Sequence, residues 1–147
     1  MSSLKNLTVI VVTYKTDGEI LDKCLQSINK NVQIKLIENS ESFKDKELLE
    51  NKFPNVSVHC TGGNLGYGGG NNFGLKTSNT DFALILNPDV VCESDFFENI
   101  KLYLDKQLNF SIIGASLKEK SSFSSSGLFN ENKKKIYFNN SNLKSLK

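Results

Sequence analysis

The stretch from Asn64 to Gly74 reads Asn-Leu-Gly-Tyr-Gly-Gly-Gly-Asn-Asn-Phe-Gly, and the rest of the chain is organised around it. Five glycines and three asparagines in eleven residues offer little apolar surface to a core. They indicate either a backbone that a ligand can approach closely or a flexible linker. The first interpretation is favoured, because linkers are usually richer in serine and lie between complete domains.

Short apolar runs on both sides of this stretch predict an α/β fold with a mainly parallel sheet flanked by helices. The expected strands are Leu7–Val12, Ile34–Ile37, Val56–His59, Phe82–Leu86 and Phe110–Ala115. Amphipathic segments between the runs supply the helices. Ligands of such sheets bind at the carboxyl ends of the strands, so the polar residues that end each strand are the first candidates for a site.

Capping patterns predict where the helices begin. Thr16–Glu19 has the form of a capping box, Ser42 is a candidate cap for a helix through Glu50, and Asp95–Glu98 opens a third helix. The glycine stretch is expected to run into a helix at Asn71–Lys76. The first N–H groups of that helix would favour an anion.

Composition narrows the class of protein. At 147 residues the chain has the size of one domain, and its net charge is +2. All 18 basic residues are lysine, which argues against a nucleic-acid binder that reads bases or phosphates with arginine. The three cysteines lack a CxxC pair, so we expect reduced thiols in a soluble, cytoplasmic protein. Lys133–Lys135 is either a solvated face or a patch for peripheral association with the inner face of a membrane.

Polar side chains follow three of the expected strands. Thr13 and Tyr14 end the first strand, Glu38 and Asn39 end the second, and Asn87-Pro88-Asp89 ends the fourth. Glu38 is suited to accept hydrogen bonds from a base or a ribose, and the final aspartate is suited to hold a hard divalent cation shared with phosphate oxygens. The set therefore points to a nucleotide at the carboxyl edge of the sheet.

Each of these features also has a purely structural interpretation. Asn-Pro-Asp is a common turn, Glu38–Ser40 can be a solvated loop, and His59 has no visible partner and is expected to be structural. The glycine stretch does not match the dinucleotide-binding pattern GxGxxG, so a Rossmann dehydrogenase is disfavoured.

Four segments together resemble the donor half of a family 2 glycosyltransferase of the GT-A fold. In order, they are Thr8–Tyr14, Ile37–Ser40, Asn64–Gly74 and Leu86–Val90. Within that family the chain is similar to the rhamnosyltransferase-like enzymes of bacterial surface polysaccharide assembly. The resemblance covers about residues 7–117, and residues 1–117 are taken as the nucleotide-sugar-binding half of a truncated GT-A fold. It leaves 118–147 as an irregular polar tail with a hairpin around Ile136–Phe138.

The resemblance implies a role for each candidate residue. Thr13 and Tyr14 would flank the base, Glu38 and Asn39 would lie beside the base or ribose, and Asp89 would hold Mg²⁺ or Mn²⁺. The residues that it implies for the nucleotide-sugar loop are Asn64, Gly66, Gly70, Asn72 and Gly74. Asn87 stands where the family's Asp-x-Asp element has its first acid, and Glu38 stands where an aspartate is usual.

The activity implied is inverting transfer of a sugar from a nucleoside-diphosphate sugar to a glycan or lipid-linked acceptor in polysaccharide synthesis. Such transfer needs a general base, because a sugar hydroxyl is a poor nucleophile at neutral pH. The resemblance implies that this base lies in a C-terminal half beyond the metal position. The carboxylates after the metal position do not form the expected acidic motif, so no catalytic base is assigned: Glu93, Asp95, Glu98, Asp105, Glu119 and Glu131.

Two alternatives remain open. One is a non-catalytic remnant or interaction module that kept the fold. The other is a nucleotidyltransferase, which is disfavoured because Thr13–Asp17 lacks the basic, glycine-rich signature expected after the first strand. Apolar surface left by a missing half would also favour a homo-oligomer.

Overall fold

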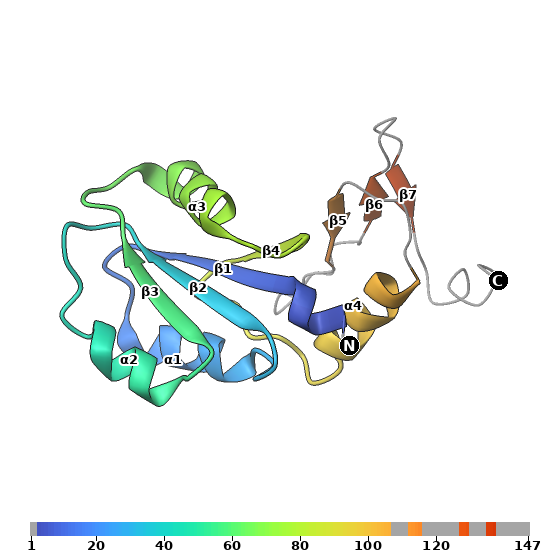
Figure 1. Ribbon diagram of the computed structural model, residues 1–147, viewed down its shortest axis with the longest axis horizontal. Coiled ribbons are helices and arrows are strands. Elements are labelled where there is room, and N and C mark those ends of the chain that lie inside the picture. The colour runs from blue at the N-terminus through green and yellow to red at the C-terminus, as the bar shows by residue number, and fades with distance from the viewer. Residues whose placement is uncertain (1–2, 107–111, 116–126, 130–134, 138–147) are drawn as a thin grey trace, which may run out of the picture. The chain divides into compact units, whose positions relative to one another are not determined.

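The computed structural model describes residues 3–106, 112–115, 127–129 and 135–137. The chain divides into two compact units, Met1–Asp105 and Lys106–Lys147. The first unit holds a parallel four-stranded sheet of order β3-β2-β1-β4 (Figure 1). Its strands are β1 (Leu7–Thr13), β2 (Gln33–Glu38), β3 (Val56–Cys60) and β4 (Phe82–Leu86). The predicted α/β class and the first four predicted strands are confirmed.

Helices lie on both faces of this sheet (Figure 1). On one face are α1 (Gly18–Ser27) and α2 (Lys46–Lys52), and on the other is α3 (Gly66–Thr77). The helix α4 (Phe96–Asp105) packs against the short 3-10 helix Ser3–Asn6. Because β1 is central and covered on both sides, all seven of its residues are buried.

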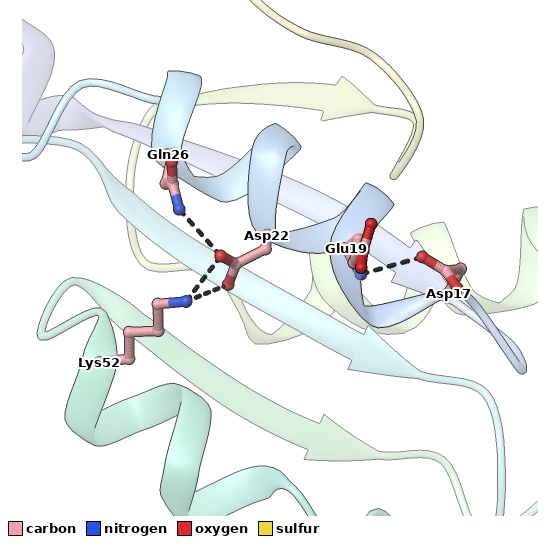
Figure 2. A network of polar contacts seen from close by, with 5 residues as sticks. All are labelled: Asp17, Glu19, Asp22, Gln26 and Lys52. Atoms are coloured by element: carbon pink, nitrogen blue, oxygen red, sulfur yellow. Dashed lines mark hydrogen bonds and ion pairs between the residues drawn. The ribbon is translucent and has the colours of Figure 1, made fainter.

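A polar network on the protein surface joins α1 to α2 (Figure 2). Asp22 in α1 accepts hydrogen bonds from Lys52 Nζ at 2.6 and 2.7 Å and from Gln26 Nε2 at 2.8 Å. The lysine side chain is 49% exposed, so solvent screens the ion pair and it adds little to stability. The burial of the apolar sides of the two helices accounts for most of their attachment to the sheet.

Two predicted helix caps are wrong by a few residues. The N-cap of α1 is Asp17, whose carboxylate accepts a hydrogen bond from the amide of Glu19 at 2.9 Å (Figure 2). It also accepts one from the amide of Ile20 at 3.1 Å. The capping-box pattern had assigned this role to Thr16. Ser42 lies before α2, which begins at Lys46. Several Ser, Thr and Asp side chains compete at each boundary, and local pattern alone does not rank them.

The helix α3 begins at Gly66, whereas the sequence predicted a start at residue 71. All five glycines of the stretch therefore lie in α3, and two of them let the helix approach β1 closely. A Cβ atom at Gly70 would lie 2.7 Å from Val12 Cγ1, and one at Gly74 would lie 2.6 Å from Ile10 Cγ2. Neither distance is tolerable for a carbon pair, so close helix-to-strand packing accounts for these two glycines.

The edge strand β4 is only partly covered. Ile85 pairs in register with Ile10, whose side chain packs on α3, so both side chains point to the same face of the sheet. Since α3 contacts β1 and β2, Ile85 remains 45% exposed.

The second unit contains a separate antiparallel sheet of order β5-β6-β7. Its strands are Ile112–Gly114, Gly127–Phe129 and Lys135–Tyr137. The fifth predicted strand therefore exists within Phe110–Ala115, but the expectation that it extends the parallel sheet is wrong, because it pairs with β6. An apolar run marks a strand without specifying its partner. Several predictions fall outside the described residues. They concern most of the lysine run (133–134), the carboxylates at 119 and 131, and the end of the tail (139–147).

Candidate functional site

The ends of β1 and β2 bring together a hydroxyl and a carboxylate. Thr13 and Glu38 are partners in the parallel register, and Thr13 Oγ1 donates a hydrogen bond of 2.7 Å to Glu38 Oε2. Both residues are buried, at 1% and 4% exposure. The second carboxylate oxygen, Oε1, makes no hydrogen bond to any described residue. Asn71 Oδ1, and not Glu38 Oε1, is the buried polar atom without a partner in the described part of the chain, so Oε1 keeps access to solvent and can accept hydrogen bonds from a ligand.

Asn39 follows Glu38 and organises the turn that leads into α3. Its Nδ2 donates to Gly66 O at 3.0 Å and to Asn64 Oδ1 at 3.2 Å, and its Oδ1 accepts from Leu65 N at 3.0 Å. Asn64 Oδ1 also accepts from Gly66 N at 2.8 Å, and Gly66 has a φ of +71°, which favours glycine. Asn39 is 2% exposed, so its side chain shapes the turn from inside.

The two neighbouring asparagines of α3 differ in their exposure. Asn72, a predicted site residue, is exposed. Asn71, which was not selected, is 5% exposed and donates through Nδ2 to Tyr67 O at 3.0 Å. Its Oδ1 is buried and has no hydrogen-bond partner among the described residues. Starting the helix at Gly66 would have put Tyr67, Asn71 and Gly74 on one helical face, and this was the missed signal.

The segment Asn87–Asp89 follows β4 and is fixed by contacts to α1. Cys24 Sγ donates to Asn87 O at 3.6 Å, and Cys92 N donates to Ser27 Oγ at 3.0 Å. Burial raises the pKa of the Cys24 thiol to about 12, and the nearby Cys92 and Asp89 add to the effect. The thiol therefore stays protonated and can donate to the carbonyl at neutral pH. The side chains of Asn87 and Asp89 are exposed.

A direct hydrogen bond joins α3 to this segment. Tyr67, in the first turn of α3, donates from its hydroxyl to Asn87 Oδ1 at 2.6 Å. The polar ends of β1, β2 and β4 and the start of α3 thus meet along one edge of the sheet. Tyr14, at the end of β1, is 45% exposed, and Lys15 Nζ lies 5.2 Å from the centre of its ring.

The segment after β4 offers a single carboxylate to a metal ion. No group of three His, Cys, Asp or Glu side chains that could hold a metal occurs in the described part of the chain. Asp89 offers one exposed carboxylate. Mg²⁺ commonly takes one or two carboxylates and completes its octahedral shell with water and substrate phosphate oxygens. Asp89 therefore fits a cation that arrives with a diphosphate, and the described residues do not form a protein-only cage.

The architecture and the position of these polar groups define a class of α/β domains that bind ligands at the carboxyl edge of a parallel sheet. The sequence profile of glycosyl transferase family 2 matches residues 8–145, so the chain belongs to that family. The predicted family is confirmed, whereas the likeness to its rhamnosyltransferase branch stays a prediction.

Individual relatives agree with this assignment. The chain is 30% identical over 115 residues to the low-salt glycan biosynthesis hexosyltransferase Agl10 of Haloferax volcanii, covering 75% of this chain and 36% of that protein. It thus spans about a third of the length of this relative. Two crystal structures of S. aureus TarS share the fold. One covers 68% of this chain and 19% of TarS at 20% identity and a TM-score of 0.57. The other, TarS 1-349 in complex with UDP, covers 79% of this chain and 42% of that chain at 17% identity and a TM-score of 0.58.

Proposed function

We propose that the chain binds the nucleoside-diphosphate part of a sugar donor at the carboxyl edge of its parallel sheet, as the donor site of an inverting glycosyltransferase. The acceptor would be a glycan or a lipid-linked glycan. The buried Glu38 carboxylate carries the proposal, because Thr13 fixes one of its oxygens and leaves the other for a ribose hydroxyl or a base N–H. The UDP complex of TarS, which shares the fold, supports a nucleotide as the ligand.

In this proposal Asp89 holds Mg²⁺ or Mn²⁺ together with the diphosphate. A divalent cation bound there would supply charge neutralisation for the diphosphate leaving group. Tyr14 offers an exposed ring at the end of β1 on which a base can stack, and Asn64 keeps its Nδ2 group for the ligand. A cytoplasmic location, membrane association and self-association stay predictions. No helix within the described residues has the length and apolar character needed to span a bilayer.

A non-catalytic donor-binding module is the second candidate. It is favoured by the carboxylates that follow Asp89 in the described part of the chain. Glu98 and Asp105 lie on α4, and Glu93 and Asp95 lie in the turn before it. None of these four residues directly follows a strand of the parallel sheet. This module would bind the same donor without deprotonating an acceptor.

Calorimetric titration with UDP, dTDP and GDP, each with Mn²⁺ and with EDTA, tests the proposal. We expect one of the nucleotides to bind more tightly in Mn²⁺, and Asp89→Ala to remove this enhancement while leaving the unfolding midpoint unchanged. Absence of binding by a folded wild-type chain would contradict the proposal. Binding without sugar transfer to any glycan acceptor would favour the non-catalytic module.

A further inference from the structure

The side chain of Asn87 is held in one orientation by a residue from another element. Tyr67 donates its hydroxyl proton to Asn87 Oδ1 at 2.6 Å, which is within the short part of the range for O–H···O hydrogen bonds. Tyr67 is 52% exposed and Asn87 is exposed too, so the contact is not a by-product of core packing. The carbonyl of Asn87 is fixed at the same time by Cys24 Sγ and by Val90 N, at 3.6 and 3.2 Å.

This orientation decides which group Asn87 can offer to a ligand. An amide side chain has an accepting oxygen on one side and two N–H donors on the other. Since Oδ1 accepts the hydrogen bond from the Tyr67 hydroxyl, Nδ2 is turned away from Tyr67. The Nδ2 group makes no hydrogen bond to any described residue. A cation requires oxygen ligands, whereas an N–H pair suits anionic phosphate oxygens.

We propose that Tyr67 is a positioning residue that fixes Asn87 as a hydrogen-bond donor to the diphosphate of the sugar nucleotide, leaving Asp89 as the protein's carboxylate for the cation. The inference rests on the proposed donor site and specifies how that site recognises phosphate. Position 87 thus contributes a neutral donor to the ligand and no charge to the cation. Tyr67 acts only through Asn87.

A double-mutant cycle on the full chain tests this inference, with the nucleotide among UDP, dTDP and GDP that binds wild type in Mn²⁺. Tyr67→Phe keeps the ring and removes the hydroxyl, and we expect it to weaken binding about fivefold. Asn87→Ala removes the donor to a charged group, and a loss of about tenfold is expected. The double variant should bind no more weakly than Asn87→Ala, because the two residues act as one unit. Asn79→Ala, an exposed asparagine after α3, is the matched control and should bind like wild type.

Asn87→Asp separates donation to phosphate from ligation of the cation. If Asn87 donates, the carboxylate replaces the N–H pair, repels the diphosphate and weakens binding in Mn²⁺. Tighter Mn²⁺-dependent binding by this variant would overturn the inference, as would unchanged binding by Tyr67→Phe or losses that multiply in the double variant. In those cases wild-type binding persists and the proposed function stands. A wild-type chain that binds none of the nucleotides would overturn both.

Discussion

Two polar regions at the carboxyl edge of the same sheet differ in what holds their side chains. The first, the Asn39 cluster, consists of the buried Asn39 together with Asn64 and the main chain of Leu65 and Gly66, which are exposed, and its hydrogen bonds are made within the chain. The second, the exposed segment Asn87–Asp89, is fixed through its main chain and through one tyrosine, and its remaining polar groups face solvent. The comparison separates residues that build the site from residues that are free to contact a ligand.

Substitution of Asn39 should give the largest effect on stability, because it would break the Asn39 cluster. Asn39→Ala removes four side-chain hydrogen bonds, and it leaves the carbonyl of Gly66 and the amide of Leu65 without their partner. We expect a loss of about 3 kcal/mol in the free energy of unfolding, measured by chemical denaturation.

Asn79→Ala is the control for this change, since Asn79 is exposed, and its unfolding free energy should stay within about 0.5 kcal/mol of wild type. A loss below about 1 kcal/mol for Asn39→Ala would contradict the view that the cluster holds the turn before α3.

Alanine substitutions at two glycines of α3 should change the free energy of unfolding by smaller amounts and in opposite directions. In Gly74→Ala the new Cβ would meet Ile10 at 2.6 Å, and overpacking of about 1 to 3 kcal/mol should outweigh the gain in helix propensity of about 1 kcal/mol. In Gly68→Ala the new Cβ meets no atom within 4 Å, so the change should stabilise the protein by about 0.5 to 1 kcal/mol. Thermal and chemical unfolding of both variants measure this difference. Equal shifts in one direction would show that close packing on β1 does not require glycine at 74.

The smallest expected effect is a dependence of stability on pH that comes from His59 in β3, the strand next to the one that leads into the Asn39 cluster. Burial lowers the pKa of His59 below its usual value, and the positive charges of Lys35 and Lys46 lower it further. The unfolded chain therefore binds the proton more readily, and stability is lost as pH falls from about 6.5 through the folded pKa. Wild type should lose more stability than His59→Gln between pH 7.5 and pH 5.5. Identical pH profiles for the two proteins would contradict a lowered pKa.

Much of the fold could be predicted from local pattern. The β-branched run at Leu7–Val12 and the apolar run at Phe82–Leu86 both form strands of the parallel sheet. The first run is apolar throughout because it is covered on both faces, whereas the second forms the partly covered edge strand. Placement of Thr13 and Glu38 side by side follows from the same reasoning, since parallel strands end at one edge.

The candidate site was less accessible to sequence reasoning. The stretch around Gly70 looks like a ligand loop in composition, and only its distance to Val12 shows that the missing Cβ serves helix packing. Asn71 and Asn72 are adjacent and chemically identical, so nothing local says which one is buried. That difference depends on where α3 begins and on which of its faces meets the sheet.

The sequence by itself determined the family, the alternation of strands and helices and the edge at which polar residues collect. These properties follow from local periodicity and from motif order, which are written along the chain. The tertiary structure decided that Ile112–Gly114 pairs with β6, that Asn39 is enclosed by the turn it shapes, and that Tyr67 reaches Asn87. Contacts between residues far apart in sequence depend on how whole elements pack, and local patterns do not encode that choice of partner.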